Sequence, residues 1–137
     1  MALSSAQIRP GIVAYLDAAA LNADAAVVKP VSPTTRNGPF LCFARSGQMS
    51  GWAPISTQHR DERLLISQEW RVSGGGSWQQ DDQYLNDGST TYVGPNASFI
   101  AAATATDKFD AATRPRVLPA GVTAVVGEIQ ARGGKVP

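Results

Sequence analysis

Apolar and polar residues alternate most clearly over residues 64–72, where the sequence reads LLISQEWRV. The apolar side chains fall on one face of an extended chain and the polar ones on the other; the apolar set is Leu64, Ile66, Trp70 and Val72. A period of two residues is typical of a strand with one buried face. The pattern therefore predicts a half-buried strand over residues 64–72.

A second pattern predicts a β-hairpin over residues 40–57. Residues 40–45 (FLCFAR) form a short aromatic run between Gly-Pro and Ser-Gly pairs, which is typical of a strand buried on both faces. Residues 51–57 follow after a tight turn, so the two runs should pair. Pro54 lacks an amide hydrogen and places the second strand at a sheet edge or beside a bulge.

Strand-like runs recur to the end of the chain, at residues 90–93, 98–106 and 122–129. The alanine-rich residues 17–26 are compatible with a short helix, but nine prolines spread along the chain oppose a helical bundle. The pattern therefore predicts an all-β domain, either a small β-barrel or a jelly-roll or other β-sandwich.

The same pattern predicts which side chains form the core. They are the inward-facing apolar residues of the expected strands: Ile12, Val13, Phe40, Cys42, Phe43, Ile55, Leu64, Ile66, Trp70, Tyr92, Ile100, Val122, Val126 and Ile129. Cys42 is the single cysteine, so it cannot form an internal disulfide, and we interpret it as a small apolar filler.

Composition narrows the classes of function. The 137 residues fit one domain, and 12 basic against 11 acidic residues give a formal net charge of +1. A nucleic-acid partner is not expected, because such proteins usually carry a clustered basic excess. Arg9, Pro10 and Gly11 interrupt the apolar run that a secretory signal would need, and no stretch approaches the roughly 20 apolar residues of a membrane span.

The chain ends suggest contacts with other chains. Charged residues make up only 17% of the sequence, which is a weakly charged surface for a free monomer. We expect residues 1–10 and 132–137 to form extended arms that reach neighbouring chains, with Arg132 and Lys135 in the second arm.

His59 is the only histidine, and it lies in the polar run TQHRDER. It could act as a general base beside Asp61, or bind phosphate together with Arg60. The simpler interpretation is a solvated loop with balanced charges, because the sequence places no nucleophile beside it.

Residues 81–87 (DDQYLND) form an acidic loop whose oxygens resemble ligands of a hard cation. Their spacing does not match the established calcium loop, so we interpret the segment as hydrated and predict no metal. The sequence also has no glycine-rich nucleotide-binding motif, because the triple glycine at 74–76 lacks the lysine that would bind phosphate. No cofactor is expected.

Residues 73–94 lie between expected core strands and are long for a connection. Trp78 follows the three glycines, so it either anchors a contact with a partner or covers the open end of a barrel. In the first interpretation the segment is a docking lobe, with Trp78 and Tyr84 as apolar anchors and a polar rim of Asp81, Asp82 and Asp87.

Three short stretches resemble the PemK/MazF toxins, which are small SH3-like barrels that cleave RNA. The opening PGIV at 10–13, the RNGPFLCF at 36–43 and the APISTQ at 53–58 are similar to the first three strands of that family. The resemblance implies an endoribonuclease in which Arg36 stabilises the phosphorane and Thr57, helped by His59, manages the proton. The excursion at 74–94 is longer than the loops of the family.

The chain also resembles the decoration (cement) proteins of tailed-phage capsids. The resemblance rests on its weak charge, its many small residues and the lack of a catalytic motif in the sequence. That resemblance implies a non-enzymatic virion protein, made in the host cytoplasm, which bridges neighbouring subunits of the shell. Its partners would be the major capsid or another virion protein and copies of itself. This is the first expectation from the sequence, and a cytoplasmic endoribonuclease is the alternative.

Overall fold

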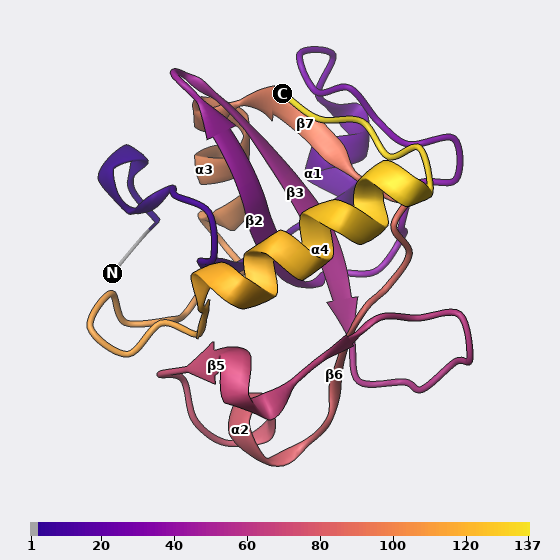
Figure 1. The fold of residues 1–137 in the computed structure, drawn as a ribbon. Helices are drawn as coiled ribbons and strands as arrows, with labels where there is room; N and C mark the ends of the chain where they lie inside the picture. The colour runs from indigo at the N-terminus through magenta and orange to yellow at the C-terminus, as the bar shows by residue number, and fades with distance from the viewer. Residues whose placement is uncertain (1–2) are drawn as a thin grey trace.

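The fold is a β-rich mixture of strands and helices around one antiparallel sheet (Figure 1). The computed structural model describes residues 3–137. The main sheet has six strands: β1 (Val13–Leu16), β2 (Gly38–Ser46), β3 (Met49–Ser56), β4 (Leu65–Ile66), β6 (Gln83–Leu85) and β7 (Tyr92–Pro95). Their order is β1-β2-β3-β6-β4, and β7 also pairs with β3.

A second sheet and several helices complete the molecule. The second sheet pairs β5 (Arg71–Val72) with β8 (Arg116–Val117). The helices are α1 (Ala18–Ala23), α2 (Ser77–Gln80), α3 (Asn96–Ala103) and α4 (Pro119–Ala131), with the 3₁₀ turns η1 (Ser5–Gln7) and η2 (Gln68–Trp70).

The predicted hairpin is confirmed as β2 and β3. The two strands pair antiparallel, from Phe40 opposite Pro54 to Ser46 opposite Met49. Gly47, whose φ is +60°, makes the tight turn between them in a conformation that glycine adopts at little cost.

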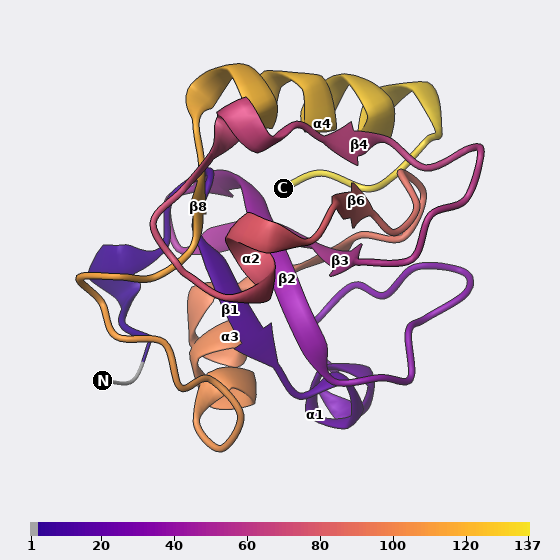
Figure 2. The ribbon, with the colours of Figure 1, turned by 90° about the horizontal axis from the view of Figure 1, so that it is seen from below.

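Helices cover both faces of this hairpin, which makes the fold three layers deep (Figure 2). Since neighbouring side chains of a strand point to opposite faces, β2 sends Phe40 and Cys42 into one core and Leu41 and Phe43 into another. The first core lies under α1 and α3, and the second lies under α4.

The prediction of a β domain is therefore confirmed in part: an antiparallel sheet organises the fold, but helices contribute as well and the sheet does not close into a barrel. Of the runs expected as strands, residues 98–103 lie in α3 and residues 122–129 in α4, while residues 104–106 form a turn after α3. Gly121, Val125 and Ile129 are buried at intervals of four, which is the stripe of a helix rather than of a strand. Pro119 at the first turn of α4 suits a helix start, because its missing amide hydrogen would have no partner there.

Residues 64–72 also depart from the expected single strand. The segment pairs with β6 through Leu65–Ile66, turns through η2, and pairs with β8 through Arg71–Val72. Its two halves thus belong to different sheets. The alternation of apolar and polar residues in the sequence runs on through the turn between them, so it does not mark the break. The helix expected within residues 17–26 is present as α1, where Asp17 accepts a hydrogen bond from the Ala20 amide at 3.2 Å.

Most of the predicted core is buried. The residues that are fully buried as expected are Ile12, Val13, Phe40, Cys42, Phe43, Ile55, Ile66, Tyr92 and Ile129. Those only partly buried are Leu64, Trp70, Ile100, Val122 and Val126. Burial raises the pKa of the Cys42 thiol to about 12, so that it packs as a neutral group.

The outer edge of β1 is closed by polar groups from residues 107–117 instead of by another long strand. The Val13 amide donates to the Pro115 carbonyl at 3.1 Å, and the Tyr15 amide donates to Asp107 Oδ1 at 2.9 Å. Arg114 donates to the Val13 carbonyl at 3.0 Å and forms a salt bridge with Asp107 at 2.7 Å. Both charged side chains are almost completely buried, at 3% and 0% exposure, so each depends on the other.

We predict that Asp107→Asn destabilises the fold by about 3 kcal/mol, because it leaves the buried Arg114 guanidinium without an opposing charge. The urea midpoint of the variant should fall well below that of the wild type. Asp82→Asn, at an exposed carboxylate, is the matched control and should leave the midpoint unchanged. Equal midpoints for all three proteins would contradict the role given to this ion pair.

Candidate functional site

A hollow lies at the end of the β2–β3 hairpin that is opposite its turn. It is a cavity of about 560 Å³ between the chain entering β2 and the chain leaving β3. We call this hollow the arginine pocket. Its lining includes Arg36, Thr57, Arg60 and Arg63. Arg36 and Thr57, which the resemblance to PemK/MazF singled out, therefore line one pocket.

Arg63 joins two of the segments that line the arginine pocket. Its guanidinium donates to the Ser56 hydroxyl at 3.0 Å and the Gln58 carbonyl at 2.9 Å, on the chain that leaves β3. It also donates to the Asn86 carbonyl at 2.9 Å and the Asn86 Oδ1 at 2.7 Å, on the chain that leaves β6. The planar fork of arginine is needed to reach both segments at once.

All of these acceptors are neutral, so the charge of Arg63 is not cancelled by contact. Burial lowers the pKa of Arg63, the neighbouring Arg60 lowers it further, and Glu62 and Asp87 act in the opposite direction. An arginine nevertheless stays protonated at neutral pH. Within residues 3–137 the two ion pairs are Asp107–Arg114 and Glu128–Arg132, so none neutralises an arginine of the pocket.

The rest of the lining supplies neutral hydrogen-bonding groups. Thr57 is exposed and offers a hydroxyl, and Gln58 offers an amide. Asn37 uses its Oδ1 to accept the Ala18 amide at 2.9 Å, which fixes its side chain. No carboxylate or imidazole is among the described residues that line the pocket. Guanidinium and hydroxyl donors without a competing acid form a site for an oxyanion such as phosphate.

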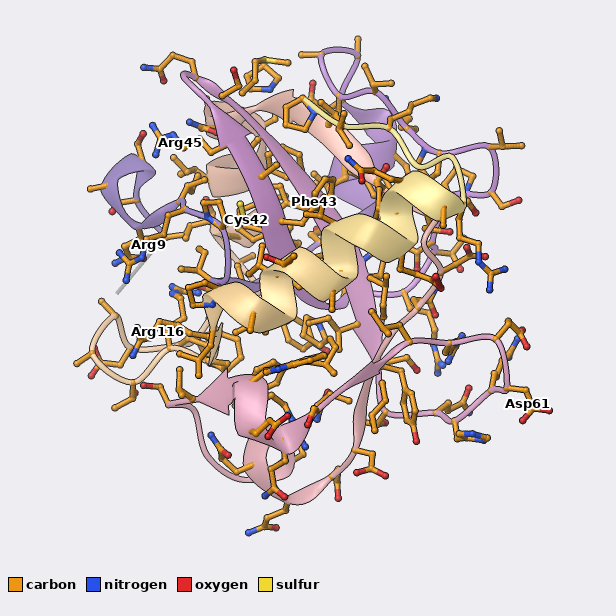
Figure 3. The ribbon with its side chains drawn as sticks, in the orientation of Figure 1. Arg9, Cys42, Phe43, Arg45, Asp61 and Arg116 are labelled. Carbon is orange, nitrogen blue, oxygen red and sulfur yellow. The ribbon has the colours of Figure 1, made fainter. Side chains whose placement is uncertain are left out.

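His59 is close to this site in sequence but does not line it. Its exposed ring packs edge-on against Tyr84, with ring centroids 5.6 Å apart. No hydrogen bond joins His59 to Asp61 in the described chain, and Asp61 lies at the outer end of the β3–β4 loop (Figure 3). The pairing of these two residues as a general base, which was the alternative to a solvated loop, is therefore not formed.

The acidic loop does not gather into a cation site. Asp87 accepts hydrogen bonds from the amide and the hydroxyl of Ser89, at 2.8 and 2.9 Å, and Asn86 binds Arg63. Asp81 and Asp82 are exposed. Among residues 3–137, no group of three potential metal ligands comes together.

Trp78 is not the exposed anchor that one interpretation of the sequence expected. Positive φ angles at Ser73, Gly74 and Gly76 reverse the chain, and α2 then places Trp78 in the second core with 6% exposure. Its indole nitrogen donates to the Val72 carbonyl at 3.3 Å. Tyr84 is also buried, at 7%. The proposed docking lobe thus presents its acidic rim to solvent, but not its two apolar anchors.

The expected arms do not extend from the domain in the part of the chain that is described. Leu3 and Ile8 are buried, and Arg45 donates to the Ser5 and Ile8 carbonyls at 2.7 and 2.8 Å. These apolar anchors hold residues 3–10 against the first core.

The other end of the chain is attached in a similar way. The Thr91 hydroxyl donates to the Lys135 carbonyl at 2.8 Å, and Lys135 Nζ donates to the Lys29 carbonyl at 2.9 Å. Residues 132–137 therefore return along the domain in the single chain, and their contact with neighbouring chains stays a prediction.

Comparison of the chain with protein-family models, with curated proteins and with solved structures gives no match. In residues 3–137, no helix combines the length and the apolar character needed to cross a bilayer. The fold and the site together define a β-rich domain that carries an arginine-lined polar pocket at one end of its central hairpin.

We predict that Trp78→Ala destabilises the isolated domain by about 3 kcal/mol or more, because it leaves a large cavity in the second core. The measurement is the free energy of unfolding in urea. Trp78→Phe keeps most of the buried ring and should lose much less. An alanine variant as stable as the wild type would restore the interpretation of Trp78 as a surface anchor.

We predict that Arg63→Lys loosens the arginine pocket although it keeps the positive charge. An ammonium group cannot span the acceptors on both segments, Ser56 and Gln58 on one side and Asn86 on the other, and each net hydrogen bond lost costs about 1 kcal/mol. Amide hydrogen exchange should become faster in residues 57–64. Arg60→Lys changes an exposed arginine three residues away and should leave that exchange as in the wild type.

Proposed function

We propose that the arginine pocket binds a phosphate of single-stranded RNA and stabilises it during cleavage. The observation that carries the proposal is that Arg36 and Thr57 line the same pocket. They stand on separate segments of the chain, and the resemblance to PemK/MazF assigns them the two catalytic roles. Arg60 and Arg63 add positive charge on the same lining, which the resemblance did not anticipate.

RNA suits this lining because it supplies its own nucleophile. The 2′-hydroxyl oxygen attacks the adjacent phosphorus, the bond to the 5′-oxygen of the next nucleotide breaks, and a 2′,3′-cyclic phosphate and a 5′-hydroxyl result. The proton that the 2′-hydroxyl loses balances the one that the 5′-oxygen gains. The protein then has to stabilise charge on the phosphorane and move one proton.

The residues divide these two tasks. Arg36 and Arg60 are exposed and contact no carboxylate among the described residues, so their guanidinium groups are available to the phosphorane oxygens. Arg63 is occupied by Ser56, Gln58 and Asn86 and acts as a positioning residue. The Thr57 hydroxyl both donates and accepts, so it can pass the proton. His59, which is outside the lining, takes no direct part.

We predict that Arg36→Gln lowers the rate of RNA cleavage by about 100-fold or more, the usual loss when a transition-state donor is removed. Thr57→Ala should also abolish most of the activity. The measurement is cleavage of an end-labelled single-stranded oligoribonucleotide, with a DNA strand of the same sequence as the uncleaved reference.

Arg116→Gln is the control, because Arg116 is exposed on β8 and lies on the other side of the molecule from Asp61 and its loop (Figure 3). It should cleave as the wild type does. Wild-type protein that leaves RNA intact, or an Arg36→Gln variant that is fully active, would overturn the proposal.

The second candidate is the capsid decoration role, in which the domain bridges neighbouring shell subunits. What favours it is exposed apolar surface on a weakly charged protein, with Val28 at 47% and Val31 at 97% exposure. The buried Trp78 and the packed chain ends remove two of its earlier supports. A purified protein that stays monomeric and binds no partner in a virion would leave this candidate without support.

A further inference from the structure

Two further hollows continue from the arginine pocket along the same side of the molecule. The second, of about 260 Å³, shares Thr34, Arg60, Arg63 and Asn86 with the arginine pocket. The third, of about 400 Å³, shares Ser32, Asp87, Thr90 and Arg132 with the second. The three hollows therefore form one row, which we call the basic groove.

Four segments of the chain build the basic groove. They are the α1–β2 connection, the β3–β4 loop, the β6–β7 connection and the C-terminal end of α4, and they lie on the right in both Figure 1 and Figure 2. Arg132 joins two of these segments, since its Nη2 donates to the Glu62 carbonyl at 3.3 Å. The groove thus runs from the end of the hairpin to the end of α4.

Charge is distributed unevenly between this groove and the rest of the protein. The ionisable side chains that line it are five basic and two acidic residues: Arg36, Arg60, Arg63, Arg132, Lys135, Glu62 and Asp87. Their formal charge is +3, whereas the whole chain carries +1. The remainder of the molecule is therefore net negative, and an extended anion is attracted to this side.

The two basic residues beyond the arginine pocket keep most of their charge available. The Arg132–Glu128 pair is 3.5 Å long and the Arg132 side chain is 45% exposed, so solvent screens the attraction. Lys135 Nζ donates to a neutral carbonyl, that of Lys29. Asp87 also lines the groove; its Oδ1 accepts hydrogen bonds from the neutral Ser89 amide and hydroxyl, so the carboxylate keeps its charge and offsets part of the basic excess.

We infer that the basic groove binds a second phosphate of the same RNA strand through Arg132, with Lys135 beyond it. The ligand is therefore an oligonucleotide that spans several phosphates, and a single nucleotide fills only the arginine pocket. This inference rests on the proposed function, because it extends the strand that the arginine pocket is proposed to hold. Base identity has no part in it, since a guanidinium bound to phosphate carries no sequence information.

The test compares a dinucleotide with a nine-nucleotide strand, both carrying 2′-O-methyl groups so that neither can be cleaved. Arg132→Gln should weaken binding of the nine-mer and reduce the slope of log affinity against log salt by about 0.7, the value for one phosphate contact on a single strand. Binding of the dinucleotide should not change. Fluorescence anisotropy at several salt concentrations measures both quantities.

Two control variants distinguish the loss of a positive charge from damage to the fold. Arg132→Lys keeps the charge and should retain the wild-type salt slope, whereas a purely structural loss would not be rescued. Arg116→Gln removes one exposed positive charge on the other side of the molecule and should leave both affinities unchanged.

The outcomes distinguish this inference from the proposed function. If Arg132→Gln binds the nine-mer with the affinity and salt slope of the wild type, the groove does not hold the strand, while dinucleotide binding and cleavage still support the arginine pocket. If the wild type binds neither RNA, the proposed function fails and the groove with it. If a nine-residue glutamate peptide binds as tightly as the nine-mer and competes with it, the groove serves an acidic protein and the RNA assignment is overturned.

Discussion

Burial of the β2–β3 hairpin on both faces is the constraint from which the rest of the structure follows. A strand that is covered on both sides needs an apolar residue at every position, and β2 provides this through Phe40, Leu41, Cys42 and Phe43. Two separate cores then require two helical covers, which is why α3 and α4 lie on opposite faces of one sheet (Figure 2). The N-terminal segment and α1 complete one cover, while α2 and the short strands complete the other.

The candidate site follows from where this covering stops. At the end of the hairpin opposite Gly47, the chain enters β2 and leaves β3 through loops whose backbone is not paired in a sheet. Arg63 replaces that missing pairing with side-chain hydrogen bonds to Ser56, Gln58 and Asn86. Because every acceptor is neutral, the group that stabilises the loops also leaves a positive charge at the pocket. Stability and anion attraction here depend on the same side chain.

The sequence pattern predicted the structure best where the local signals for strand and turn agreed with burial in the folded chain. Residues 40–57 carry both a doubly apolar strand and a tight turn, so the hairpin and much of the core could be predicted. Residues 98–106 and 122–129 could not be assigned correctly by β-propensity, because short apolar runs rich in alanine and valine fit a buried helix as well as a strand. Pro119 and the four-residue spacing of the buried positions in α4 were the available signals for a helix.

The candidate site was predictable only in part, for a related reason. Arg36 and Thr57 could be named from short stretches that resemble a family, whereas Arg63 could not be named and Arg132 was named only as part of an expected arm. Their roles depend on loops that meet only in the folded chain, and neither loop has a periodic pattern. Trp78 illustrates the opposite error, since the glycines before it indicated an exposed loop. Their positive φ angles instead turn the indole inward.

The contacts on the two edges of β1 imply an order in which these parts of the chain fold during synthesis. One edge of β1 pairs with β2, which leaves the ribosome early, but the other edge waits for Asp107, Arg114 and Pro115. Until those residues emerge, β1 presents unpaired backbone groups that another nascent chain could join. Closing this edge needs contacts about a hundred residues apart, and such contacts form slowly. The buried ion pair therefore also marks the moment at which the growing chain stops being open to strand exchange.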